Sequence, residues 1–359
     1  MRRALPVSTL LSMITMFTMF TPAVSQAQRV APREAEATTP AQRTVLTRGW
    51  VGLWKVGSLP TDDLFFVPRE LLATEQGVYV LDVGTLQLHA FDRGGRKRWT
   101  VGSKGQGPGQ FQRPVDIAAG VGGDIAVLDP GNGRIAFFSA SGEYRRSVAS
   151  RDAVQATGVC ITSDGRMQLW VDRPGPNIVI LDRGGALHQS RTFPWPVPPD
   201  APTLLRQAFF ARGEVSSDCA FATLFGFGTG RVSPTAPASV TPYIEAVPMP
   251  TIVQERVKSG GARATITEGL NAATAAMRSG DTVLVQFHGA STLARAVLDL
   301  YGAGGGYLQS WRMPPCERVA YHSAVLYCMT NMAEEPTLVA FAAKADTARV
   351  LRGIRTGRR

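Results

Sequence analysis

The sequence lacks several features that would point to a particular class of protein. Charged residues make up 18% of its 359 residues, and the 38 basic residues include only five lysines. Past residue 27, no stretch is long and apolar enough to span a bilayer. A G-x-x-x-x-G-K-[ST] phosphate loop, a G-x-S-x-G nucleophile elbow and paired C-x-x-C zinc motifs are also absent. These absences argue against a membrane-spanning protein, a P-loop enzyme, a serine hydrolase of that type and a zinc-ribbon protein.

The N-terminus has the pattern of a secretory signal. Arg2 and Arg3 precede an apolar stretch, and Ser25-Gln26-Ala27 provides a small-x-small cleavage site. The alternative is an uncleaved membrane anchor, but the apolar stretch is interrupted by threonines and is short for a span. We expect residues 1–27 to be removed, residues 28–46 to form a disordered lead-in, and the mature protein to be periplasmic or secreted.

The net charge of +10 invites comparison with nucleic-acid-binding proteins. The arginines are scattered, however, and the one basic cluster is the C-terminal tail, residues 347–359. An exported protein rarely meets nucleic acid, so we predict no nucleic-acid partner.

A repeat of about 45 residues runs through the chain. Its clearest copy, residues 102–148, contains four short apolar or polar segments separated by Gly-Gly, Asn-Gly and Ser-Gly turns, which is typical of four antiparallel strands. Asp82, Asp129 and Asp172 occupy equivalent positions in three successive copies, 47 and 43 residues apart. Later copies are weaker, and residues 270–277 have a helical composition although their place in the repeat favours an innermost strand.

The repeat predicts an all-β fold, a six-bladed β-propeller of four-stranded antiparallel blades over residues 47–346. Residues 52–57 resemble the outer strand at 98–102 and precede the first complete copy. We therefore expect this N-terminal strand to complete the last blade and close the ring, which hides the open sheet edges.

The second copy also resembles a known family. Residues 105–111 (GQGPGQF), Pro114, the strand 125–129 and the turn 132–135 (NGRI) are similar to an NHL-type repeat. The chain thereby resembles secreted bacterial six-bladed propellers related to NHL repeats. That resemblance implies the fold and leaves the activity open, because propellers include binding modules, scaffolds, lyases and lactonases.

Four cysteines follow the signal segment, and export favours disulfides among them. In the repeat register, Cys316 and Cys328 lie on two antiparallel strands of the last blade, which favours a disulfide between them. Cys160 and Cys219 remain as a second candidate pair from adjacent blades.

No set of residues stands out as a catalytic or metal-binding centre. Asp82, Asp129 and Asp172 could be acid/base groups or calcium ligands, but an aspartate that recurs at a strand end is better explained as a turn cap that accepts backbone N–H bonds. The four histidines, which show no metal-binding spacing, are His89, His188, His288 and His322. His288 and His322 fall near inner strands, so a metal or acid/base role is an alternative for these two.

The sequence therefore favours a binding module over an enzyme. We expect this module to be an exported monomer that recognises a protein, peptide or glycan. The Pro-rich segment 193–199 could line its recognition surface or act as a stiff linker. The alternative function is a propeller lyase or lactone hydrolase with a divalent metal in the central channel. Apart from that metal, no cofactor is indicated.

Overall fold

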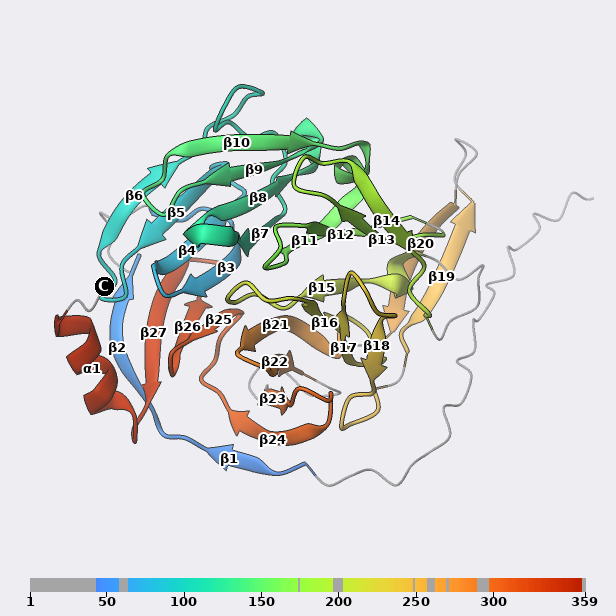
Figure 1. Ribbon diagram of the computed structural model, residues 1–359. Helices are drawn as coiled ribbons and strands as arrows, with labels where there is room; N and C mark the ends of the chain where they lie inside the picture. Colours follow the sequence, from blue (N-terminus) through green and yellow to red (C-terminus); the bar gives the residue numbers. More distant parts are fainter. Residues whose placement is uncertain are drawn as a thin grey trace, which may run out of the picture.

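The computed structural model describes residues 43–57, 64–173, 175–195, 203–247, 249–256, 262–268, 271–288 and 297–356. These residues form six four-stranded antiparallel blades arranged in a ring (Figure 1). The predicted signal, residues 1–27, and most of the predicted lead-in lie outside the described residues.

We number the blades 1 to 6. In blades 1 to 5 the strands run outward from the axis in chain order, whereas the outermost strand of blade 6 comes from the N-terminal segment. Their strands are, for blade 1, β3 (Pro68–Thr74), β4 (Gly77–Asp82), β5 (Gln87–Phe91) and β6 (Lys97–Val101); for blade 2, β7 (Asp116–Ala119), β8 (Ile125–Asp129), β9 (Arg134–Phe138) and β10 (Tyr144–Ala149); for blade 3, β11 (Ala156–Ile161), β12 (Met167–Val171), β13 (Ile178–Leu181) and β14 (Leu187–Arg191); for blade 4, β15 (Ala208–Phe210), β16 (Cys219–Thr223), β17 (Thr229–Val232) and β18 (Ser239–Thr241); for blade 5, β21 (Ala273–Ser279), β22 (Thr282–Phe287), β23 (Val297–Tyr301) and β24 (Tyr307–Arg312); and for blade 6, β25 (Arg318–His322), β26 (Val325–Thr330), β27 (Thr337–Ala343) and β2 (Trp50–Val56).

The N-terminal strand closes the ring, as the sequence predicts. β2 pairs antiparallel with β27, with Trp50 opposite Ala343 and Val56 opposite Leu338. Preceding it, β1 (Val45–Thr47) runs parallel to β24 along the outside of blade 5 (Figure 1). β1 therefore begins inside the segment expected to be a disordered lead-in, and the N-terminal segment holds two blades together.

Burial explains which strands lie where. Every residue of β4, β8 and β12 is buried, because both faces of a middle strand pack against neighbouring blades. The outer strands β6 and β10 are rich in exposed Arg, Lys and Ser. The stretch with helical composition is a strand after all: β21 pairs with β22 over its whole length, so sheet contacts override the helix propensity of its alanines.

Two segments lie outside the ring. β19 (Thr251–Arg256) and β20 (Ala262–Glu268) form a two-stranded hairpin beside blade 4 (Figure 1). At the C-terminal end, α1 (Thr347–Thr356) packs against blade 6 through the buried Val350. None of the helices in the described ranges is long and apolar enough to cross a membrane.

A tryptophan on an outer strand latches one blade to the next. The indole of Trp54 on β2 lies over Gly95 in blade 1 and donates its Nε1–H to the carbonyl of Arg93, at 2.9 Å. Trp99 on β6 repeats this arrangement over Gly142 of blade 2, with a 3.0 Å bond to Ala140. Both glycines have φ between 80° and 90°. That conformation, and the absence of a side chain, let each ring lie directly on the turn.

Both predicted disulfides are present. Cys316 and Cys328 are bonded within blade 6, and Cys160 and Cys219 join blade 3 to blade 4. The second bond links blades across the part of the chain where the repeat is weakest.

The aspartates at the strand ends differ among blades. Asp82 accepts hydrogen bonds from the backbone amides of Phe66, Val67, Gly84 and Thr85. Asp129 is fully buried and accepts from the amides of Gln112 and Arg113 and from the side chain of Asn132. Asp172 departs from this arrangement: it is exposed, and its side chain makes no hydrogen bond to another described residue.

We predict unequal effects for two matched substitutions. Asp129→Asn replaces an acceptor oxygen with a donor that faces other donors, so it should lower the free energy of unfolding by about 1–3 kcal/mol. Asp172→Asn should change it by less than about 0.5 kcal/mol. Urea unfolding of the two variants beside the parent measures both values, and equal losses would contradict the assignment of Asp129 as a buried cap.

Candidate functional site

The two ends of the disc differ in the segments they carry. One end, which we call the connection face, carries the segments that lead into each innermost strand and the turns between second and third strands. The other end, the hairpin face, carries the turns between first and second strands. The alternating direction of antiparallel strands fixes this division.

Three charged side chains from three blades meet across the propeller axis. Arg212 follows β15 in blade 4, and its Nη2 lies 2.6 Å from Glu70 on β3 and 2.7 Å from Asp116 on β7. All three side chains are largely buried. Asp116 also accepts the backbone N–H of Val159 on β11, at 2.8 Å. The axial triad, Arg212, Glu70 and Asp116, therefore ties blades 1 to 4 together at the centre.

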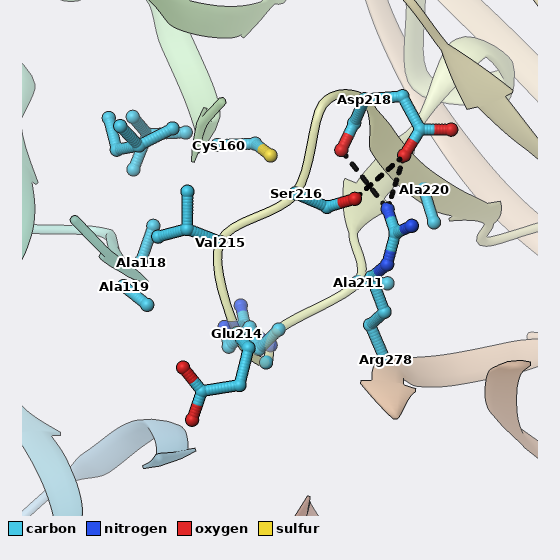
Figure 2. A pocket seen from close by; sticks show the side chains of 14 residues that line it. Ala118, Ala119, Cys160, Ala211, Glu214, Val215, Ser216, Asp218, Ala220 and Arg278 are labelled. Carbon is cyan, nitrogen blue, oxygen red and sulfur yellow. Dashed lines mark hydrogen bonds and ion pairs between the residues drawn. The ribbon is translucent and has the colours of Figure 1, made fainter. Parts of the chain in front are cut away.

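The backbone around Arg212 explains how the side chain reaches the axis. Arg212 donates its N–H to Ala276 on β21 and accepts from Arg278, so this segment pairs alongside the inner strand of blade 5. The chain then passes to blade 3, where Ser163 donates to Ser216. Figure 2 shows this loop running between neighbouring blades, with Glu214 and Val215 at its bend.

Burial and charge act in opposite directions in the axial triad. Burial raises the pKa of Glu70. The positive charge of Arg212 acts to lower this pKa and the negative charge of Asp116 acts to raise it, and the net pKa lies above its ordinary value. For Arg212, burial acts to lower the pKa, but Glu70 and Asp116 outweigh it and the pKa is raised. The guanidinium therefore stays charged, and it is the counter-ion for both carboxylates.

A second charged cluster lies beside the first. Asp218 accepts a hydrogen bond from Arg278 (Figure 2). Asp218 also lies 3.1 Å from Arg231. Burial alone would raise the pKa of Asp218, but its hydrogen bonds to the two arginines hold it below the ordinary value. The cavity among these residues measures about 20 Å³. That volume holds roughly one water molecule and no larger ligand.

The hairpin face carries acidic groups near the axis. His322 lies 3.2 Å from Glu75 and 3.5 Å from Glu214, and Arg93 lies 3.5 Å from Glu75. In the described residues, no group of three or more His, Cys, Asp or Glu side chains is arranged to hold a metal ion.

The connection face carries a larger cavity between blades 1, 2 and 3. It measures about 370 Å³. Its polar lining comprises Arg69, Gln112, Arg113 and Thr157, and its apolar lining comprises Val83, Leu86, Pro114, Val115 and Ala156. We call it the connection-face pocket.

Exposed apolar side chains surround this pocket. Phe66 is 71% exposed and lies over Gly84, next to the lining residue Val83. Val67 and Val154 are also exposed, and Val154 accepts a hydrogen bond from Arg113 through its carbonyl oxygen. Exposed aromatic and apolar groups beside arginines are typical of binding surfaces.

The four histidines do not converge. His89 lies on β5 and His188 on β14, and burial together with Lys97 lowers the pKa of His89 to about 4. His288 follows β22 and contacts Thr274, while His322 ends β25 on the hairpin face. Strand direction places His288 and His322 toward opposite ends of the disc, so they cannot share a site.

The Pro-rich segment begins in the core. Phe193 is buried, and Trp195 packs on it and on Trp170 between blades 3 and 4. Residues 196–199 lie outside the described residues.

Comparison with known proteins supports the fold. No family model matches the sequence, and no curated protein matches it. An exported protein from Bacteroides fragilis has a TM-score of 0.52 at 10% identity, over 84% of this chain and 99% of that one. A virginiamycin B lyase from Staphylococcus aureus has 0.46 at 12% identity, over 79% and 82%. A regucalcin from Agrobacterium tumefaciens has 0.49 at 11% identity, over 84% and 98%. At 10% identity the likeness to the first of these concerns the fold alone, and no argument rests on the other two, whose TM-scores lie below 0.5.

We predict that the axial triad behaves as one unit. Arg212→Met leaves the buried Asp116 without its counter-ion and leaves Glu70 with only the more distant Arg69, so it should lower the free energy of unfolding by about 3–5 kcal/mol. Adding Glu70→Gln should recover part of that loss, because one uncompensated charge is removed. Urea unfolding measures both, with Arg96→Met, at an exposed turn, as the control. A single variant as stable as the parent would contradict this role.

Proposed function

We propose that this protein is an exported binding module that recognises a protein, peptide or glycan with its connection face. The observation that carries the proposal is the exposed Phe66, with Val67 and Val154, around a pocket that contains two arginines. Buried apolar anchors and arginines supply most of the energy in characterised interfaces, and an exposed phenylalanine in a free monomer is a candidate anchor.

Export is part of this proposal. Two disulfides support an oxidising compartment, the periplasm or the outside of the cell, and the N-terminal signal pattern agrees with it. The resemblance to NHL-type propellers is compatible with a binding role, but it remains a prediction from the sequence.

The alternative, an enzyme with a divalent metal on the axis, fits these residues less well. The carboxylates that two inner strands bring to the axis are Glu70 and Asp116, and Arg212 lies within 2.7 Å of both. A cation would have to displace a guanidinium that already satisfies them. The donor set thus suits an internal ion pair better than a metal ion.

We predict that Phe66→Asp abolishes ligand capture. A charge at the centre of the apolar patch should prevent its burial against a partner. The immobilised mature protein is incubated with envelope extract, and components retained by the parent are compared with those retained by the variant. Leu187→Asp is the matched control, because Leu187 is 60% exposed on the outer strand β14.

The expected result is capture by the parent and by Leu187→Asp, with loss in Phe66→Asp at unchanged thermal stability. Equal capture by both variants would place recognition elsewhere and contradict the proposal.

A further inference from the structure

The connection-face pocket combines a cationic part with an apolar part. We propose that it binds a small organic anion that has an apolar body, with the anionic head at Arg69 and Arg113. This inference rests on the proposed function because it uses the same face, and it adds a small-molecule site to the surface proposed to recognise a protein, peptide or glycan.

The first argument is that the arginines of this face have no close carboxylate partner of their own. Among the described residues, the guanidinium of Arg113 donates only to the carbonyl of Val154. The guanidinium of Arg318, at the start of β25, donates only to the carbonyls of Arg69 and Glu317. Carbonyl partners orient a guanidinium without neutralising its charge.

Arg69 is also poorly compensated. Its Nε lies 3.8 Å from Glu70, while the same carboxylate lies 2.6 Å from Arg212. Arg212 is thus the closer partner of Glu70. Elsewhere arginines close to the axis have carboxylate partners, as Arg278 and Arg231 do with Asp218. At the pocket, therefore, the Arg113 guanidinium has no ion-pair partner among the described residues and Arg69 has only the shared Glu70, which leaves both guanidinium groups able to bind an anion.

The second argument is that the pocket is held in place before a ligand arrives. The buried Asp129 accepts the backbone N–H groups of Gln112 and Arg113. Pro114 follows directly, and the Val154 carbonyl bonds to the Arg113 guanidinium at 3.2 Å. A site fixed in this way loses little conformational entropy when the ligand binds.

The third argument concerns the size and the lining. The volume of about 370 Å³ lies at the lower end of the range for small-molecule sites. The apolar side chains of Val83, Leu86 and Val115 cannot replace the water molecules around an inorganic ion, whereas they can bury an alkyl or aryl group. The planar guanidinium fork matches a carboxylate or a phosphate monoester, so either head group satisfies the same chemistry.

The test uses three matched probes on the mature protein: phenylacetate, phenyl phosphate and the neutral phenylacetamide. Isothermal titration calorimetry gives the dissociation constants at low and high salt. Phenylacetate or phenyl phosphate should bind at least about tenfold more tightly than phenylacetamide, and this preference should shrink with added salt. The relative affinity of the two anions identifies the preferred head group.

Arg113→Gln and Arg69→Gln should each weaken the tighter anion by about tenfold and leave phenylacetamide unchanged, because only the charged head loses a partner. Arg96→Gln, an exposed arginine in a hairpin-face turn, is the control and should bind as the parent does. Thermal melting confirms that each variant is folded.

Equal affinity for anion and amide, undiminished anion binding in Arg113→Gln, or no binding of either anion at millimolar concentration would each overturn the inference. If one of these results is found together with loss of capture in Phe66→Asp, the proposed function stands and only the small-anion site is ruled out. If one of these results is found together with unchanged capture in Phe66→Asp, the connection face is ruled out as a binding surface.

Discussion

The contact of one guanidinium with two carboxylates at the centre of the ring is the constraint on which the arrangement of the blades depends. A propeller blade contacts only its neighbours, so the axis is the one place where blades opposite one another can interact. Arg212 uses that place to join blade 4 to blades 1 and 2, and its backbone joins blade 5. The same contact pairs the two carboxylates, Glu70 and Asp116, that inner strands bring to the axis.

With Arg212 on the axis, the proposed binding site lies on a face of the disc, and the two faces present different groups. The hairpin face carries Glu75 and Glu214 around His322. The connection face carries Arg69 and Arg113 beside exposed apolar groups. This difference is the reason for proposing the connection face, with its exposed apolar groups and arginines, as the recognition surface.

The sequence predicts the ring well because its signals are local. Turn dipeptides and apolar strands recur at fixed spacing. The strand around Trp54 resembles the strand around Trp99 in sequence, and this likeness predicts ring closure. In the structure, both tryptophans donate a hydrogen bond to a turn of the next blade. The axial triad was not predictable, because Arg212 and Asp116 are 96 residues apart and the turns and apolar strands that define the repeat do not single out either residue. Asp172 shows the limit of equivalence between copies: it shares the position of Asp129 but is exposed, and in its blade the ion pair is made by the next residue, Arg173, with Asp152.

The central claim is that Arg212 takes the place that a divalent cation could occupy on the axis. Thermal melting of the parent and of Arg212→Met, each with and without millimolar calcium, tests it directly. The account predicts that calcium leaves the parent unchanged and raises the melting temperature of the variant, whose two carboxylates have lost their counter-ion. A parent protein that is purified with a stoichiometric metal, and that loses stability when a chelator removes it, would contradict the claim.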